Sequence, residues 1–453
     1  MVTNSLGHES AYFYDERNLC TFVGYHDYSQ ISYEYNDRYE LVSERDEEGR
    51  TTTYTYNNYS QMKSVTRPDG STVTLDYDEN GRLITATNPE GASRQWTYND
   101  DDTLNTSIDE NGSETTYSYN ENKLIETVTN AKGDKVCLSY DKDRNLSQVT
   151  LPDGTSSTWK YDSHGNCIST TNPLGAEQLY EYDTLNRLVK ANLADGNMVQ
   201  LAYNAYDEVV KAKDNQTEVT FAYTALGSLT SRTQGGKTVK FKYDTEEQLT
   251  AVTNEKGEVY HFNRDGKGNI TTETGFDGTT RTYERDLSGL VTKINRSSDR
   301  WTEYEHDAVG NIIRADYSDG TWDNFVYNKN GALVEAANEH TAVVFERNNS
   351  GQVVKEIQTH KDKNKDKDEN GKEGEKGEEG KEVSYSVESQ YNELSNRTQI
   401  TTSLGAVINT TRNQMGQAAS TTANFGSAAP WTAQMQYNGL GQEITRLLSG
   451  DIL

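Results

Sequence analysis

A tyrosine recurs every 21 residues through the first half of this chain, and each one is followed by Asp or Asn. A fixed period of this length is typical of repeat architectures, in which every unit must stack on its neighbours to make a shared apolar layer. The frame continues beyond the tyrosines at spacings of 20 or 21 residues. We call these positions the anchors: Tyr14, Tyr35, Tyr56, Tyr77, Tyr98, Tyr119, Tyr140, Tyr161, Tyr182, Tyr203, Tyr223, Tyr243, Arg264, Arg285, His306, Tyr327 and Arg347.

Each anchor belongs to a predicted hairpin. A bulky apolar residue lies two positions before the anchor and another apolar residue six positions after it, as Leu75 and Leu83 do around Tyr77. A spacing of two is the side-chain period of a β-strand. A three-residue loop at 79–81, with Gly81 in the left-handed conformation, places Tyr77 opposite Leu83 on one face of the sheet.

A second turn falls fourteen residues after the anchor, where glycine recurs behind Pro and an acidic residue, as in Pro89-Glu90-Gly91. Proline presets φ for the first central position of such a turn. Each repeat therefore contributes two strands to a long antiparallel meander, and the predicted fold class is all-β. Open twisted sheets rarely exceed about ten strands without curling, so this sheet must roll up. Its apolar stripe needs cover from another part of the coil or from an enclosed partner.

The run from Tyr77 to Leu83, followed by Pro89-Glu90-Gly91 and Tyr98, resembles the repeat of the RHS/YD-repeat family, and the similarity spans nearly the whole chain. That family includes bacterial polymorphic toxins, the B/C components of insecticidal toxin complexes, and the teneurins. The resemblance implies a β-sheet that spirals into a curved or hollow shell. It also implies a scaffold for encapsulation or surface interaction.

Three segments are predicted from the pattern: a YD-repeat array at 1–359, a charged disordered loop at 360–382, and degenerate repeats of the same array at 383–453. The loop consists mostly of Lys, Asp, Glu, Asn and Gly. It has almost no apolar side chains whose burial could offset the entropy lost on ordering the backbone. Its run 366–371 matches half of a calcium-loop pattern, but position twelve is Gly377, and solvated charge is the favoured interpretation.

The register resumes at Tyr391, Arg412 and Tyr437. The apolar slot six residues later then holds Arg397, Ala418 and Glu443. These substitutions leave two alternatives for the end of the array, either degenerate repeats or a different pairing of strands.

The net charge of −27 argues against nucleic-acid binding and against binding to an anionic membrane, since both depend on basic clusters. No stretch approaches membrane-spanning length. Residues 2–7 resemble the middle of a repeat, so we expect the chain to begin inside a larger array, with any export signal upstream. The expected location is extracellular or at the cell surface.

No motif assigns catalytic, cofactor-binding or metal-ligating residues, and the chain is expected not to be an enzyme. His164, in a turn, and His306, at an anchor, are interpreted as structural. Cys20, Cys137 and Cys167 follow no disulfide or zinc spacing, and Cys20 and Cys167 occupy apolar slots.

The anchor arginines Arg264, Arg285 and Arg347 are expected to pack their aliphatic stems in the aromatic stripe with their heads in solvent. The alternatives are stacking on the neighbouring ring or contact with an acidic partner.

These observations predict a non-enzymatic RHS/YD-repeat scaffold, a fragment of the encapsulating shell of a secreted or surface-displayed toxin-type protein. Its expected partner is an enclosed polypeptide cargo, an effector or toxin domain. The alternative is a cell-surface adhesin that binds a glycan or protein through its aromatic-rich sheet. A weaker third class is a repeat-borne hydrolase with a pair of carboxylates.

Overall fold

The computed structural model describes residues 1–361, 382–426 and 429–449. Within these ranges the structure contains 41 β-strands and no helix. The described residues also contain no apolar helix of the length needed to cross a membrane.

The strands are β1 (Val2–Thr3), β2 (Glu9–Tyr14), β3 (Cys20–Tyr25), β4 (Gln30–Tyr35), β5 (Leu41–Arg45), β6 (Thr51–Tyr56), β7 (Met62–Thr66), β8 (Thr72–Tyr77), β9 (Leu83–Thr87), β10 (Ser93–Tyr98), β11 (Leu104–Ile108), β12 (Glu114–Tyr119), β13 (Ile125–Thr129), β14 (Lys135–Tyr140), β15 (Leu146–Thr150), β16 (Ser156–Tyr161), β17 (Cys167–Thr171), β18 (Glu177–Tyr182), β19 (Leu188–Asn192), β20 (Met198–Tyr203), β21 (Val209–Lys213), β22 (Glu218–Tyr223), β23 (Leu229–Gln234), β24 (Lys237–Tyr243), β25 (Leu249–Thr253), β26 (Val259–Arg264), β27 (Ile270–Thr274), β28 (Thr280–Arg285), β29 (Val291–Arg296), β30 (Arg300–His306), β31 (Ile312–Tyr317), β32 (Trp322–Tyr327), β33 (Leu333–Asn338), β34 (Thr341–Arg347), β35 (Val353–Lys361), β36 (Glu382–Tyr391), β37 (Arg397–Thr402), β38 (Ala406–Arg412), β39 (Ala418–Phe425), β40 (Trp431–Tyr437) and β41 (Glu443–Ser449). Each pairs antiparallel with the next along the chain, so the sheet is the predicted meander.

The hairpin of β8 and β9 shows how one repeat folds. Tyr77 pairs with Leu83, as the sequence predicts, and the Asp78 N–H donates to the carbonyl of Arg82 at 3.0 Å. The Asp78 carboxylate accepts the N–H groups of Asn80 and Arg82 at 3.0 and 2.9 Å, which holds the loop closed. Gly81 has φ of 81°, so the predicted left-handed position is confirmed. The loop after β9, at residues 88–92, is built in the same way around Asn88.

A β-bulge in every anchor hairpin was missed by sequence reasoning. The register shifts between Asp76 and Tyr77, because Asp76 pairs with Thr85 while Tyr77 pairs with Leu83, and Ile84 is left over. The same shift occurs in the hairpin of each anchor from Tyr14 to Tyr437. A bulge bends its strand and increases the local twist. Repeated in every repeat, it gives the sheet a regular curvature.

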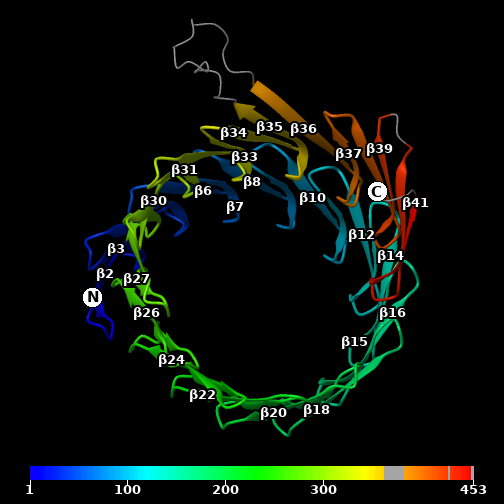
Figure 1. Cartoon of the computed structure of the whole chain (residues 1–453), viewed down its shortest axis with the longest axis horizontal. Coiled ribbons are helices and arrows are strands. Elements are labelled where there is room, and N and C mark those ends of the chain that lie inside the picture. The colour runs from blue at the N-terminus through cyan, green and yellow to red at the C-terminus, as the bar shows by residue number, and fades with distance from the viewer. Residues whose placement is uncertain (362–381, 427–428, 450–453) are drawn as a thin grey trace, which may run out of the picture.

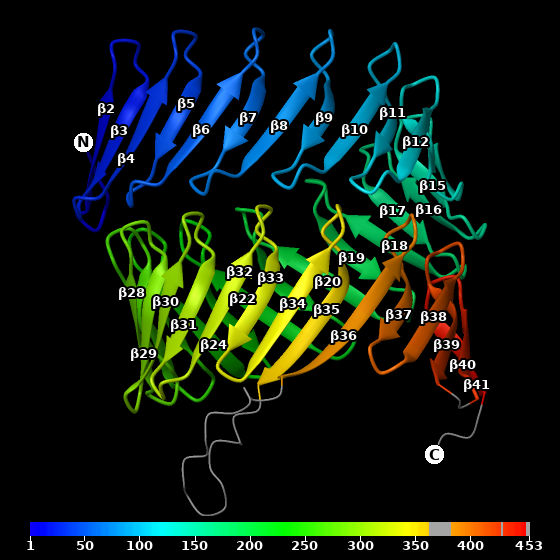
Figure 2. The same ribbon diagram turned by 90° about the horizontal axis from the view of Figure 1, so that it is seen from above.

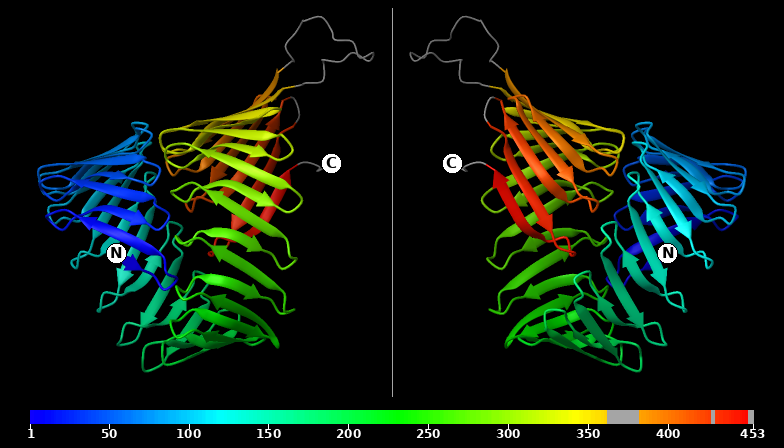
Figure 3. Two further views of the ribbon diagram at one scale, coloured as in Figure 1. Left: turned by 90° about the vertical axis from the view of Figure 1, so that its left-hand side faces the viewer. Right: turned by 90° about the vertical axis from the view of Figure 1, so that its right-hand side faces the viewer.

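The curved sheet winds around an open centre (Figure 1). After one full coil the chain continues into a second, which lies beside the first and not over its face (Figure 2). The middle strands join the two coils, and both coils are seen from either side in Figure 3. The expectation that another part of the coil covers the apolar stripe is therefore wrong, because the second coil meets the first edge to edge.

The wall is one layer thick, and its packing reflects this. The buried apolar residues are small, such as Val23, Ala191 and Ala315, and among the described residues no large side chain is fully buried. The accessible surface is 28312 Å², against about 17,000 Å² for a compact monomer of this mass. The apolar side chains are thus covered mainly by neighbours in the same sheet.

The segment after β34 requires a correction. The sequence places a loop at 360–382, but His360 pairs with Val383 and Lys361 with Glu382, so the ladder runs further than expected. Backbone pairing continues there because it does not require apolar side chains. Residues 362–381, including the calcium-like run, lie outside the described residues.

The last repeats keep the same pairing as the first. Tyr391 pairs with Arg397 and Tyr437 with Glu443, each with the bulge. The alternative of a different strand pairing after the insertion is therefore wrong.

Candidate functional site

The anchor tyrosines link each repeat to the one before it. The Tyr98 hydroxyl donates to the carbonyl of Leu83, the apolar-slot residue of the preceding repeat, at 2.9 Å. The bond recurs at 2.8 to 3.1 Å for Tyr35, Tyr56, Tyr77, Tyr119, Tyr140, Tyr161, Tyr182, Tyr203, Tyr223, Tyr243, Tyr391 and Tyr437. It gives the carbonyl beside the bulge a side-chain donor from the next repeat, and it therefore ties the irregular part of each hairpin to its neighbour. This ladder explains why the chain uses tyrosine and not phenylalanine at the anchor.

The anchor arginines make the same link. Arg285 donates from Nη2 to the carbonyl of Ile270 at 3.2 Å and from Nη1 to that of Gly289 at 2.9 Å. The equivalent pairs of bonds recur for Arg264, Arg347 and Arg412. The expectation that these heads lie in solvent is wrong, because the guanidinium replaces the phenol as carbonyl donor.

Arginine in place of tyrosine at the anchor has one unfavourable and one favourable effect on stability. The buried Nε of Arg264, Arg285 and Arg412 has no hydrogen-bond partner, which is unfavourable for a buried donor. Arg285 and Arg347 also lie over the rings two residues earlier, 5.7 and 5.8 Å from the ring centroids. The stacking alternative is thus confirmed for these two arginines.

The two coils meet along a seam made of turns. We call the loop after an anchor the anchor turn and the loop fourteen residues after it the return turn. Return turns of the first coil contact anchor turns of the second. The return turn at 46–50 belongs to the repeat of Tyr35 and faces the anchor turn of Arg285, which is the twelfth anchor further along. The same offset of twelve joins the repeats of Tyr77 and Tyr327.

Carboxylates cap exposed backbone N–H groups across the seam. Glu48 accepts the N–H of Leu287 at 2.7 Å, and Glu90 accepts the N–H of Lys329 at 2.8 Å. Both acceptors occupy the same position of a return turn, and both donors are the second residue after an anchor. That N–H has no acceptor within its own turn, so a facing carboxylate satisfies it.

Lys267 is the most connected side chain of the seam. Its ammonium group donates to the Ser29 hydroxyl at 2.6 Å and lies 3.1 Å from an oxygen of Asp27 and 3.4 Å from one of Glu47. It also lies 4.8 Å from the centroid of the Tyr25 ring. Only 16% of its side chain is exposed. Burial alone would raise the pKa of Asp27, but hydrogen bonds from Ser29 and Lys267 outweigh it and hold that pKa below its usual value.

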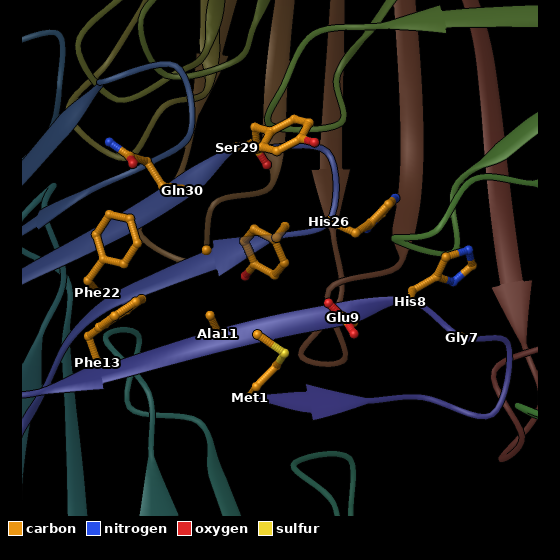
Figure 4. Close-up of a pocket in the computed structure, with 13 residues that line it drawn as sticks. Met1, Gly7, His8, Glu9, Ala11, Phe13, Phe22, His26, Ser29 and Gln30 are labelled. Carbon is orange, nitrogen blue, oxygen red and sulfur yellow. The ribbon is translucent and has the colours of Figure 1, made fainter.

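Close approach of the coils fixes the neighbouring residue as glycine. A Cβ on Gly266 would lie 2.3 Å from the imidazole of His26 and 2.8 Å from that of His8. The two imidazoles are 4.9 Å apart. They border a recess of about 590 Å³ at the N-terminal edge of the wall, lined also by Phe13, Phe22 and other residues of β2 and β3 (Figure 4).

The remaining predicted residues are scattered along the wall. Cys20 and Cys167 are half-buried and Cys137 is exposed, and all three are free thiols. Burial raises the pKa of Cys167. His164 is exposed in the anchor turn of Tyr161, and His306 pairs with Ile312. The described residues contain no group of three or more His, Cys, Asp or Glu side chains placed to hold a metal.

Comparison with known families identifies the wall. The family model described as Teneurin YD-shell matches residues 12–111, 93–198 and 181–283, which together cover more than half of the chain. The chain belongs to the YD-shell family. No curated protein matches this YD-shell chain.

Solved structures share the fold of the YD-shell chain. The crystal structure of TcdB2-TccC3 without its hypervariable C-terminal region matches with a TM-score of 0.64 and 12% identity over 98% of this chain. The crystal structure of TcdB2-TccC3-Cdc42 and the structure of the Photorhabdus luminescens Tc holotoxin pore match with TM-scores of 0.54 at 13% identity, each over 97% of this chain. The YD-shell chain spans only 29 to 30% of the length of those chains. Family and fold together establish a shell scaffold.

Proposed function

We propose that this YD-shell chain is one section of a hollow wall that encloses a polypeptide cargo, as part of a secreted or surface-displayed toxin-type protein. The solved neighbours are components of Tc toxin assemblies by their titles. The chain itself acts as a container, and the chemistry of the assembly belongs to the cargo. No observation on the described residues favours the adhesin.

The observation that supports enclosure most strongly is the seam. A sheet that merely displayed aromatic rings would have no reason to join consecutive coils edge to edge. Here Lys267, Glu48 and Glu90 close the gap between coils with charged hydrogen bonds. These contacts make the wall continuous from one coil to the next around an open centre (Figure 1), as enclosure of a cargo requires.

Protease protection tests the proposal. The complete gene product that contains this chain is treated with a broad-specificity protease, and protected fragments are identified by mass spectrometry. We expect a polypeptide without YD repeats to survive together with the wall. It should be digested once the wall has been unfolded with denaturant.

A matched control uses the complete gene product with residues 1–453 deleted, in which the same polypeptide should be digested without denaturant. Protection of that polypeptide in the deletion product would contradict enclosure by this wall. So would the absence of any protected non-repeat fragment from the intact product.

A further inference from the structure

One anchor hairpin carries an apolar pair on the face of the sheet opposite the anchor side chains. In the hairpin of β2 and β3, Phe13 pairs with Phe22. The equivalent pair contains at least one polar residue in every other anchor hairpin of the described chain, as in Thr55 with Ser64, whose hydroxyl oxygens are 2.6 Å apart. Phe13 is 55% exposed. Two rings thus replace a hydrogen-bonding pair on this face, and one of them is open to solvent.

A glycine inside a strand lies beside this pair. Gly24 belongs to β3 and pairs with Ala11, and its φ lies outside the left-handed region. A later repeat has Thr66 at the same position, and the bulge of this hairpin lies at Tyr14. A glycine in a strand interior marks a bulge, a bend, or close approach by a ligand or another backbone. Apart from its chain neighbours, only the Phe22 ring lies within 4 Å of where a Cβ on Gly24 would be among the described residues, so no other backbone accounts for this glycine.

These residues line the recess that His8 and His26 border. Its volume of about 590 Å³ lies within the range of about 300–1,000 Å³ that is typical of small-molecule sites. Figure 4 shows the rings of Phe13 and Phe22 at one end of the recess and the two imidazoles at the other. Gly266 of the second coil packs against both imidazoles and closes that end. The recess is therefore a shaped site with an apolar end and a polar end.

The apolar end fits an aromatic ring. The rings of Phe13 and Phe22 have centroids 5.3 Å apart and an interplanar angle of 72°, which is the edge-to-face arrangement that aromatic groups prefer. Ala11 and Gly24 pair with each other next to these rings and carry no side chain beyond Cβ. A further ring can lie over these two small residues and contact the phenylalanine pair in the same geometry.

The polar end fits a cation. Glu9 is the acidic residue of the lining, and none of the described residues that line the recess is Lys or Arg. Tyr25 and Tyr28 also line it, and the faces of tyrosine rings attract cations. Tyr25 already has such a contact, because Nζ of Lys267 lies 4.8 Å from its ring centroid. Tyr28 is 96% exposed, so a ligand can reach its ring.

The charge of Lys267 does not reverse this preference. Its ammonium group lies 3.1 Å from an oxygen of Asp27 and 3.4 Å from one of Glu47, so two carboxylates balance it. The chain as a whole carries a charge of −27, and a field of that sign raises the local concentration of cations. Charge and ring faces both favour a cationic ligand over an anionic one.

We propose that this recess binds a small organic cation in which an ammonium group is joined to an aromatic ring. The ring of the ligand packs over Gly24 against Phe13 and Phe22. Its ammonium group lies near Glu9 and Tyr28. The site makes no use of an enclosed cargo, so the ligand and the proposed function stand or fall separately.

Saturation-transfer NMR on the complete gene product tests for the ligand. The probe is benzyltrimethylammonium, and benzyl alcohol and phenylacetate are the neutral and anionic comparisons. We expect saturable binding of the cation. Benzyl alcohol should bind about tenfold more weakly, because it lacks the attraction between a cation and the ring faces. Phenylacetate should bind more weakly still.

Two variants remove the site by using residues that other repeats carry. Phe13→Thr combined with Phe22→Ser installs the pair that Thr55 and Ser64 form, so the hairpin should still fold. Gly24→Thr fills the space over the strand with the residue found there in later repeats. Each change should weaken the binding of benzyltrimethylammonium by at least about tenfold, because the ligand ring then loses its buried contact.

Val326→Thr is the matched control, because Val326 holds in a later repeat the position of Phe13 and is 48% exposed. It should leave binding unchanged. Three results would overturn the proposed site: no saturable binding of the cation to the parent, equal affinity for benzyl alcohol, or recess variants that bind as well as the control. Failure of cargo protection in the parent would reject the enclosure and leave the recess standing.

Discussion

Replacing Lys267 with Met should open the seam locally while leaving the wall folded. The substitution keeps the apolar stem but removes the ammonium group that contacts Ser29, Asp27 and Glu47. Losing one partner of a buried ion pair costs about 3–5 kcal/mol. The Asp27 side chain is 35% exposed, so water screens part of its interaction with the ammonium group. The lower range of about 1.5–3 kcal/mol, typical of a hydrogen bond to a charged group, is therefore the better guide. We therefore expect a loss of about 2 kcal/mol in the free energy of seam opening.

Hydrogen exchange measures this loss at one amide. The hydrogen bond of the Leu287 N–H runs across the seam to Glu48, so this amide exchanges when the coils separate. A loss of about 2 kcal/mol corresponds to roughly 30-fold faster exchange, because 1.36 kcal/mol is a factor of ten. Amides in the middle of β20, far from the seam, should be unchanged.

Lys256 provides the matched control. It is exposed in a return turn of the second coil, on the edge away from the seam. The change Lys256→Met should leave Leu287 exchange as in the parent chain. An effect below about threefold for Lys267→Met, or an equal effect for both variants, would refute the electrostatic account of the seam.

Three further changes follow from the same contacts. Tyr98→Phe should destabilise its hairpin by about 1 kcal/mol, the value of one hydrogen bond, in denaturant unfolding. Tyr59→Phe, at an exposed tip, should have no effect, and equal effects would contradict the ladder. Arg285→Tyr should leave the free energy of unfolding unchanged or raise it, because it restores the common anchor and removes a buried unpaired Nε. Arg285→Met should lower the free energy of unfolding by about 1–2 kcal/mol, because it removes the carbonyl donor. A more stable Met variant than Tyr variant would contradict carbonyl donation by the anchor. The pKa values of Asp27 and Glu246 are lowered, so these carboxylates stabilise the seam above their unfolded-state pKa values and stop doing so as pH falls below about 4. The radius of gyration from X-ray scattering should then rise. A constant radius down to about pH 3 would contradict a role of these two carboxylates in the seam.

The hairpins could be predicted from the sequence because their determinants are local. The 21-residue period, the alternation around Tyr77 and the position of Gly81 fix the loop length and the pairing with Leu83. Asn186 and Asp207 take the glycine position with φ of 61° and 64°, as their tolerance of positive φ allows.

The bulge and the seam could not be predicted in the same way. The leftover residue of the bulge varies from Ile84 to Asn105 and Glu126, so it carries no residue signal. The offset of twelve repeats is set by a small rotation per strand that accumulates along the sheet. Lys267 and Glu48 look like ordinary solvated turn residues until the winding brings them together. The position of the anchor guanidinium groups is also hidden from the sequence, because one of their two carbonyl acceptors belongs to the preceding repeat.

Disulfide formation across the seam tests the winding most directly. The side-chain oxygens of Ser5 and Thr245 are 2.7 Å apart, although the residues are 240 positions apart in the sequence. With Ser5→Cys and Thr245→Cys combined, mild oxidation should link these two residues, as identified by peptide mapping. With Ser5→Cys and Ala225→Cys, one repeat earlier, no link should form. A link in the second pair, or none in the first, would contradict a wall whose coils meet at an offset of twelve repeats.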